Sequence, residues 1–196
     1  MPAGAYSPCP GGTGENIKFC CPDLLADHQK IERMLEGEQF MACLQHIDHL
    51  LKNTPDKACL LATKALLLRV LKRAEEAQAA LGQVPGIRVH KAQGAFYMTV
   101  LFEPGVLNGR NRLSVNDPGL REIVERQCKG AAPDWCFVYQ LLGATGICVV
   151  PLTGFYSPHP GFRFTLLETD DEKRAWTYRT LAESLVEYME SGKTAA

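Results

Sequence analysis

The sequence predicts an α+β protein in which N-terminal helical hairpins precede a small α/β layered domain. Apolar residues recur every three or four positions between Pro22 and about Leu81, which indicates amphipathic helices. From Gly82 onward, glycine and proline interrupt the chain, and β-branched and aromatic residues become frequent, which favours strands. We therefore expect three parts: a flexible tail (1–21), a helical, repeat-like segment (22–84) and a small C-terminal domain (85–196).

Length and composition are those of an ordinary globular protein. The 196 residues are 46% hydrophobic and 22% charged, enough for one good core or two small ones. A net charge of -1 and a pI of about 6.5 argue against a nucleic-acid surface. No apolar run reaches the roughly 18 residues of a membrane span. The first twenty residues lack the basic start and apolar stretch of a secretory signal.

The cysteines are expected to be reduced and buried. No pair has C-x-x-C spacing, no Cys/His group has the spacing of a zinc site, and several cysteines lie within apolar periodic segments. We therefore expect no metal site and a cytoplasmic protein; a mitochondrial location is also compatible with the sequence. The eight cysteines are Cys9, Cys20, Cys21, Cys43, Cys59, Cys128, Cys136 and Cys148.

The helical segment is predicted to contain four helices. Pro22 and Asp23 suit a helix start, Gly37 suits a stop, and the residue before Pro55 is pushed out of helical geometry. The opening of the chain is rich in proline and glycine without any period, which predicts the flexible tail. We expect the helices over residues 22–37, 39–51, 58–69 and 74–81.

The C-terminal part is predicted to run strand, helix, helix, strand, strand, helix. Asp117 and Pro118 form an N-cap followed by proline at the first helical position, and "TDDE" from Thr169 to Glu172 has the capping-box pattern. The first strand is apolar on both faces, which predicts cover on both sides. The expected ranges are 94–105, 117–128, 133–144, 147–151, 161–168 and 169–190. The expected buried side chains of the three helices are Leu120, Ile123, Val124 and Gln127; Trp135, Val138, Tyr139 and Leu142; and Trp176, Leu181, Leu185 and Tyr188.

One arginine in an apolar strand is the strongest candidate for a ligand contact. Arg163 lies between Phe162 and Phe164. A planar guanidinium offers paired N–H donors that match a carboxylate, and a strand between two aromatic residues would hold that group rigidly. The alternatives are an arginine that reaches water from an edge strand, or one that pairs with Glu168 or Asp170.

Three segments of the C-terminal part carry a recognisable pattern: "QGAFYMTVLFEPG", "LLGATGICVVPLTGFYSPHPGFRFTLLE" and the long closing helix. Together they resemble the small C-terminal domain of class I pyridoxal-phosphate aminotransferases, in particular the alanine aminotransferases, over about residues 87–191. It implies that Arg163 holds the α-carboxylate of an amino or keto acid substrate. Leu152 and Thr153 depart from the glycine and serine usual in the family, which leaves the fine specificity open. The positions that match the preceding signature are Gly146, Ile147, Cys148, Val149, Val150, Pro151, Gly154 and Phe155.

The same resemblance implies machinery that this sequence does not provide. Pyridoxal phosphate needs a lysine for its Schiff base, an acid beside its ring nitrogen and a helix N-terminus for its phosphate. In the family these lie in a large domain upstream of the matched part. Lys64 lies on a leucine-rich helix without a following glycine and is interpreted as a helix-surface lysine. We expect a substrate-carboxylate-binding domain with no catalytic or cofactor-binding residue, inactive alone and unable to hold pyridoxal phosphate by itself.

A second hypothesis concerns the helical segment. "NTPDKACLLATKALLLRVLKRAEEAQAAL" resembles one tetratricopeptide-type unit of the auxiliary subunits of N-terminal acetyltransferases. This resemblance implies an adaptor that docks on a partner protein; a homodimer is also open.

The remaining candidates have simpler interpretations. His46 and His49 are expected to be solvated or hydrogen-bonded, Cys20–Cys21 to be an incidental pair, His159 to occupy a turn, and Arg110–Arg112 to form a solvated face.

Overall fold

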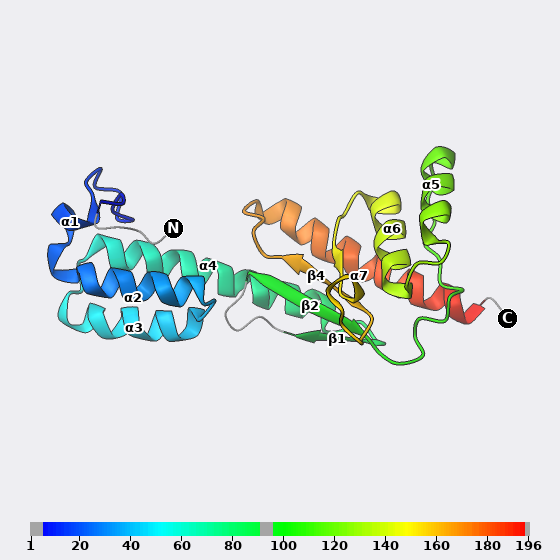
Figure 1. The fold of residues 1–196 in the computed structure, drawn as a ribbon, viewed down its shortest axis with the longest axis horizontal. Helices are drawn as coiled ribbons and strands as arrows, with labels where there is room; N and C mark the ends of the chain where they lie inside the picture. Colours follow the sequence, from blue (N-terminus) through cyan, green and yellow to red (C-terminus); the bar gives the residue numbers. More distant parts are fainter. Residues whose placement is uncertain (1–5, 91–95, 195–196) are drawn as a thin grey trace. The chain divides into compact units, whose positions relative to one another are not determined.

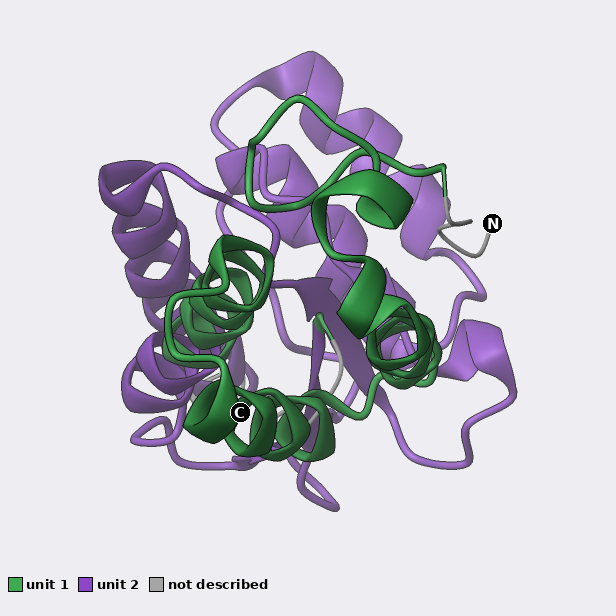
Figure 2. Cartoon of the chain, turned by 90° about the vertical axis from the view of Figure 1, so that its left-hand side faces the viewer, with its two compact units in different colours: residues 1–73, 92–96 green, residues 74–91, 97–196 purple. Residues whose placement is uncertain are grey.

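The computed structural model describes residues 6–90 and 96–194, which form two compact units (Figure 2). Unit 1 comprises residues 1–73 and 92–96, and unit 2 comprises residues 74–91 and 97–196. Unit 1 is helical and unit 2 combines helices with a sheet, so the predicted α+β class is confirmed. The predicted domain boundary after residue 84 stays a prediction. None of the helices in the described ranges has a long enough apolar run to cross a membrane.

Unit 1 contains a stack of antiparallel helices (Figure 1). A short helix α1 (Ile17–Cys20) and a 3₁₀ turn η1 (Pro22–Leu24) lead into α2 (Leu25–Glu36), α3 (Phe40–Asn53) and the first part of α4 (Ala58–Leu81). The bounds of α2 and α3 agree with the prediction to within a few residues. Their apolar faces meet in one core, whose buried members are Cys9, Cys21, Leu24, Ile31, Phe40, Cys43, Ile47, Cys59, Leu60 and Leu67.

The predicted flexible tail stays a prediction, and one predicted helix boundary in this unit is wrong. In residues 6–21, Pro8 and Asn16 form an antiparallel bridge, and Ile17 and Cys9 are buried. The glycines and prolines build turns, and the few apolar side chains between them are enough to anchor the segment. The two helices predicted over 58–69 and 74–81 are one helix, because no glycine or proline separates them and every residue between tolerates helix.

The sheet of unit 2 has four antiparallel strands in the order β1-β2-β4-β3. They are β1 (Ile87–His90), β2 (Tyr97–Phe102), β3 (Val150–Pro151) and β4 (Gly161–Thr165). β1 was not predicted, since its four residues directly follow the turn that ends α4. The predicted strands 147–151 and 161–168 are shorter than expected, and the first two residues of the predicted strand 94–105 lie outside the described ranges.

Three helices complete unit 2: α5 (Pro118–Cys128), α6 (Pro133–Thr145) and α7 (Asp171–Thr194). Asp117 caps α5 as predicted, by accepting a hydrogen bond from the backbone N–H of Leu120. Gly146 ends α6 with a φ of 78°, a left-handed conformation that favours glycine. The capping box at α7 is wrong: Asp170, not Thr169, accepts the N–H of Lys173 at 2.9 Å.

One face of the sheet carries the core of unit 2. Alternate residues of β2 are buried, together with Phe162 and Phe164 of β4. The ring of Phe137 on α6 lies 5.3 Å from that of Phe162, and Tyr178 on α7 lies 5.9 Å from Phe164. The other face of β2 is only half-buried, so the predicted cover on both sides is wrong for the described residues.

Helix periodicity predicted the buried faces only in part. Val124, Val138, Leu181, Leu185 and Tyr188 are buried as expected. Several side chains expected to be buried are instead exposed, because the element that packs against a helix determines which face of that helix is buried. Polar side chains with partners occupy several buried positions: Asn111, Asp134, Gln140 and Arg174. The residues wrongly expected to be buried are Leu120, Ile123, Gln127, Leu142 and Trp176, while Trp135 and Tyr139 are half-buried.

Candidate anion site around Arg163

Arg163 lies on an interior strand of the sheet. β4 is flanked by β2 and β3, and Arg163 is opposite Thr99 on one side and Val150 on the other. The alternation along β4 buries Phe162 and Phe164 in the core and puts Arg163 on the half-buried face. The alternative of an edge-strand arginine is therefore wrong.

Two aromatic rings hold the guanidinium of Arg163. Its Cζ atom lies 3.9 Å from the ring centroid of Phe155 and 4.9 Å from that of Tyr97. Phe155 belongs to the 3₁₀ turn η2 (Thr153–Phe155), and Tyr97 begins β2. Rings at these distances attract a cation through their electron-rich faces and also restrict its plane. The arginine is thus oriented before any ligand binds.

No acidic residue neutralises Arg163 within the described ranges. Its Nε is buried and has no hydrogen-bond partner there. Glu168 pairs instead with Lys173 at 2.8 Å, and Asp170 caps α7. The second alternative, an internal pair with Glu168 or Asp170, is therefore wrong as well.

Arg174, in the same unit, is an arginine with acidic hydrogen-bond partners and serves as a comparison for Arg163. Its side chain is 5% exposed and donates to Glu76 at 2.7 Å and to Asp171 at 2.8 Å. The hydrogen bond to Glu76 is the main reason that the pKa of Arg174 lies above its ordinary value. A buried guanidinium normally needs such partners. Arg163 has aromatic neighbours in their place, which is the arrangement expected of a group that receives an external anion.

A buried carboxylate, missed from the sequence, fixes the turn that carries Phe155. Asp134 is fully buried at the start of α6 and accepts hydrogen bonds from the hydroxyl and the backbone N–H of Thr153, at 2.6 and 3.0 Å. It also accepts from the N–H of Gly161, at 3.3 Å. Asp134 thereby ties both ends of the 153–161 loop to one helix. In sequence it looks like an ordinary acidic residue in a first helical turn, so no signal separated it from a surface residue.

Two glycines of this loop are required by close approach. A Cβ at Gly161 would overlap the carbonyl oxygen of Val100, and a Cβ at Gly154 would lie 3.0 Å from the Trp135 ring. The loop can therefore pack against β2 only with glycine at position 161, whereas a side chain at position 154 would require the Trp135 ring to shift. This packing places η2 beside the strand that carries Arg163.

The other sequence candidates are accounted for by local contacts. Lys64 pairs with Asp48 at 2.6 Å on the surface of α4, as its interpretation as a surface lysine predicts. His46 contacts Asp27 at 3.0 Å, and His49 is exposed. His159 lies in an exposed turn closed by Ser157. Arg112 donates to backbone carbonyls of its own exposed loop.

The described contacts of Arg163 suit a carboxylate and do not by themselves form a pyridoxal-phosphate site. They include neither a lysine for the Schiff base nor an acid for the ring nitrogen. Lys173, on the helix after β4, is paired with Glu168.

Comparison with known proteins relates part of this chain to aminotransferases. An uncharacterized aminotransferase from Methanocaldococcus jannaschii is 49% identical over 120 residues, 61% of this chain and 28% of that protein. Alanine aminotransferase 2 from Xenopus laevis is 32% identical over 114 residues, 57% of this chain and 18% of that protein. The mitochondrial alanine aminotransferase 2 of Arabidopsis thaliana is 33% identical over 110 residues, 55% of this chain and 18% of that protein. The chain thus spans less than a third of the length of these relatives.

Solved structures include more distant likenesses. An aminotransferase from Escherichia coli has a TM-score of 0.44 and 18% identity, covering 67% of this chain and 30% of that one. The aminotransferase Aro9 from C. albicans has a TM-score of 0.46 and 15% identity, covering 73% and 29%. No family model matches the chain. The sequence relatives support a segment of about 60% of this chain that is similar to aminotransferases, whereas the tetratricopeptide resemblance has no support.

Proposed function

We propose that unit 2 binds the carboxylate of a small amino or keto acid through Arg163, as the substrate-binding small domain of an alanine-aminotransferase-like enzyme. The observation that carries this proposal is the clamped guanidinium of Arg163, held between Phe155 and Tyr97 with no acidic partner in the described ranges. The aminotransferase relatives, which are similar to this chain over more than half of its length, support the same assignment.

The physical reason is that a partly desolvated cation is best satisfied by a planar anion. A carboxylate accepts two parallel N–H bonds from a guanidinium, and such charge-assisted bonds are roughly twice as strong as neutral ones. The two rings fix the plane of the guanidinium, so little side-chain freedom is lost on binding. In a transaminase, this contact would orient the Cα of the substrate and so contribute to rate through positioning.

We propose further that this chain alone does not transaminate. Pyridoxal phosphate supplies the electron sink for aminotransferase chemistry, and the family relation makes it the expected cofactor of the whole enzyme. The described residues around Arg163 offer this cofactor no lysine, and Lys64 is already paired with Asp48. The cofactor-binding part would come from another polypeptide segment or a partner subunit.

Carboxylate binding is tested by titrating the isotopically labelled full chain with pyruvate and with L-alanine, followed by NMR. We expect saturable shifts around β4 and η2, with a dissociation constant on the order of 1–10 mM. Arg163→Gln should weaken binding about 10–100-fold, because a charge-assisted bond is lost. Arg88→Gln is the matched control, since Arg88 is an exposed arginine of the same sheet that pairs with Glu103. Equal binding by Arg163→Gln and the native chain would refute the assignment.

Activity is tested by incubating the purified chain with pyridoxal phosphate, L-alanine and 2-oxoglutarate. We expect neither pyruvate nor the visible absorbance of a lysine-bound cofactor. Pyruvate production at a rate above that of the cofactor alone would show that the chain is a complete catalyst and would contradict the second proposal.

A further inference from the structure

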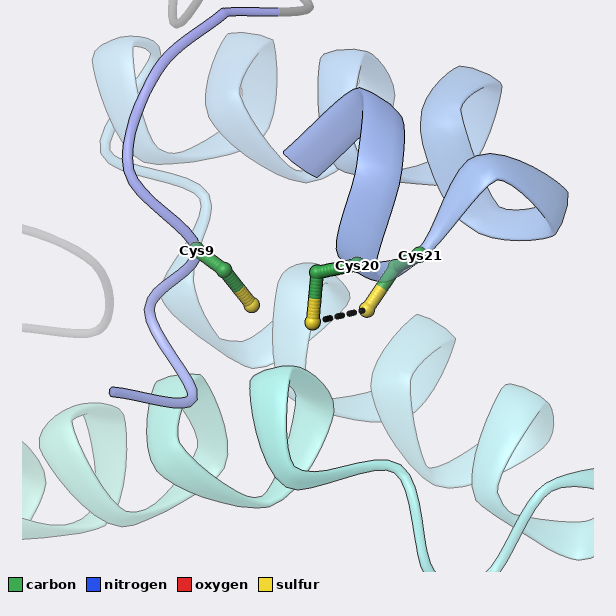
Figure 3. A group of neighbouring side chains, drawn as sticks. All are labelled: Cys9, Cys20 and Cys21. Atoms are coloured by element: carbon green, nitrogen blue, oxygen red, sulfur yellow. Dashed lines mark hydrogen bonds between the residues drawn. The ribbon is translucent and has the colours of Figure 1, made fainter. Parts of the chain in front are cut away.

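Cys9, the adjacent pair Cys20–Cys21 and Cys59 come together in unit 1 although these three places are distant in sequence. The sulfur atoms of Cys9, Cys20 and Cys21 lie within 4.8 Å of one another and point toward one another (Figure 3). The Cys21 sulfur also lies 3.1 Å from that of Cys59. The spacing of these cysteines along the chain does not resemble a zinc motif, which is why the sequence predicts no site.

The fold brings these residues together through a loop and a helix start. The bridge between Pro8 and Asn16 returns the chain on itself, so Cys9 approaches the end of α1, where Cys20 and Cys21 lie. Gly11 packs against the start of α4 so closely that a Cβ there would lie 2.9 Å from the backbone nitrogen of Cys59. Cys59 stands in the first turn of α4.

The separations among the Cys9, Cys20 and Cys21 sulfurs suit one tetrahedral ion, and Cys59 lies beside Cys21 as the candidate fourth ligand. Zinc binds thiolates at about 2.3 Å, which puts neighbouring sulfurs about 3.8 Å apart. The Cys20 and Cys21 sulfurs are 3.6 Å apart, and all four cysteines are free. Three of the four are almost fully buried, with exposures of 6% for Cys9, 3% for Cys21 and 1% for Cys59. Packed neutral thiols gain little from one another, whereas a shared dication would bind all four as thiolates.

Two polar groups beside the sulfurs support a metal site independently. His28 is 8% exposed, and its Nε2 is buried without a hydrogen-bond partner within the described ranges. A ring nitrogen of His28 lies within 4.8 Å of the Cys21 and Cys59 sulfurs. The hydroxyl of Thr13 donates to the Cys20 sulfur at 3.3 Å. Donors arranged around sulfur are the usual second layer of a thiolate metal site.

We propose that unit 1 binds one Zn²⁺ ion through Cys9, Cys20, Cys21 and Cys59, with His28 donating a hydrogen bond to a ligand sulfur. The ion ties the N-terminal segment to the start of α4. It therefore acts as a structural clamp with no open position for a substrate, in keeping with four protein ligands. The site is independent of Arg163 and of the proposed carboxylate binding.

The test uses the full chain, purified with a phosphine reductant and freed of metal. Zn²⁺ is titrated in competition with a chromogenic chelator, and Co²⁺ is then substituted to record its absorption spectrum. We expect one ion per chain and the intense bands of a tetrahedral thiolate cobalt site. Zinc should also raise the midpoint of thermal unfolding of the native chain and slow amide exchange in residues 8–21.

Matched variants separate ligands from other cysteines. Cys20→Ser and Cys59→Ser should weaken zinc binding by at least about 100-fold, because even second-layer partners contribute about 10–100-fold. Cys43→Ser controls for a change in the same core, since Cys43 is fully buried in unit 1, and Cys148→Ser controls for an exposed thiol. Both controls should bind zinc as the native chain does.

Three outcomes would overturn the proposal. The first is no zinc binding by the native chain in competition with the chelator. The second is undiminished binding by Cys20→Ser. The third is loss of binding in His28→Gln together with full binding in Cys59→Ser, which would replace the fourth ligand assigned here. A Cys21–Cys59 disulfide that forms despite the reductant, with no metal bound, would count as the first outcome.

Discussion

The candidate sites of the two units are assembled in different ways. In unit 2, Arg163 and the ring of Phe155 come from one continuous stretch of chain, a turn followed by a strand. In unit 1, the clustered sulfurs come from an N-terminal loop, the end of α1 and the start of α4. The first site could be recognised along the sequence, while the second exists only after the helices pack. A local sequence motif can therefore reveal a site built from one continuous stretch of chain, but it cannot reveal a site built from distant segments.

The two sites also differ in charge. Unit 2 presents a guanidinium, which is suited to an anion, and the rings of Tyr97 and Phe155 lie against it. Unit 1 gathers thiols, which bind cations, in a largely buried setting. In both units a buried nitrogen, Nε of Arg163 or Nε2 of His28, has no hydrogen-bond partner among the described residues, and both proposals use this observation.

Truncating a core side chain of either unit should have the largest effect on the free energy of unfolding. Phe162→Ala in unit 2 should lower the free energy of unfolding by about 3–5 kcal/mol, because Phe162 is fully buried between Phe102 and Phe137. Leu60→Ala in unit 1 should cost about 2–5 kcal/mol. Leu66→Ala, at a position 61% exposed, should stay within about 0.5 kcal/mol. Urea denaturation measures all three, and a loss below about 1 kcal/mol for Phe162→Ala would contradict the described core.

Removing the carboxylate of Asp134 should have the next largest effect. Asp134→Ala leaves the buried donors of Thr153 and Gly161 without an acceptor, at a cost of about 2–3 kcal/mol. It should also weaken pyruvate binding, since Phe155 is no longer held over Arg163. Asp134→Asn keeps one acceptor oxygen and should show roughly half of each loss. If pyruvate binding by Asp134→Ala equals that of the native chain, the loop does not position the site.

Replacing Arg163 and Arg174 in turn by methionine should separate a binding role from a structural one. Arg163→Met should change the free energy of unfolding by less than about 1 kcal/mol, because lost ring contacts are offset by the removal of a desolvated charge. It should nevertheless abolish carboxylate binding. Arg174→Met removes hydrogen bonds to Glu76 and Asp171 and should cost about 1–3 kcal/mol with binding retained. The reverse pattern, measured by denaturation and NMR titration, would make Arg163 a structural residue.

The smallest effect concerns pH. The hydrogen bond from Lys173 lowers the pKa of Glu168. A carboxyl whose folded pKa is below the unfolded value contributes stability above the unfolded pKa, and this contribution is lost as pH falls through the folded value. Lys173→Met should therefore raise the Glu168 pKa toward its ordinary value, which NMR titration measures. Because the pair is exposed, stability at neutral pH should hardly change; an unchanged Glu168 pKa in Lys173→Met would show that the ion pair does not form.

Side-chain burial was predicted less well than the elements themselves. α2, α3, α5 and α6 follow their predicted ranges closely, because their caps, glycines and prolines act over a few residues. The exposure of Ile123 and Trp176 could not be predicted, because an apolar stripe is buried only where another element covers it. Asp134 and Asn111 were missed for the converse reason: their hydrogen-bond partners lie on other elements.

By itself, the sequence determined the α+β class, the order of most elements and the placement of Arg163 between two core aromatics. These depend on periodicity and on motifs whose residues are close together along the chain. Only the tertiary structure decided that β4 is an interior strand, that Phe155 and Tyr97 enclose the guanidinium, and that four cysteines meet in unit 1. Such contacts form between segments whose spacing in sequence carries no information about their distance in space, so they follow from packing rather than from any local pattern.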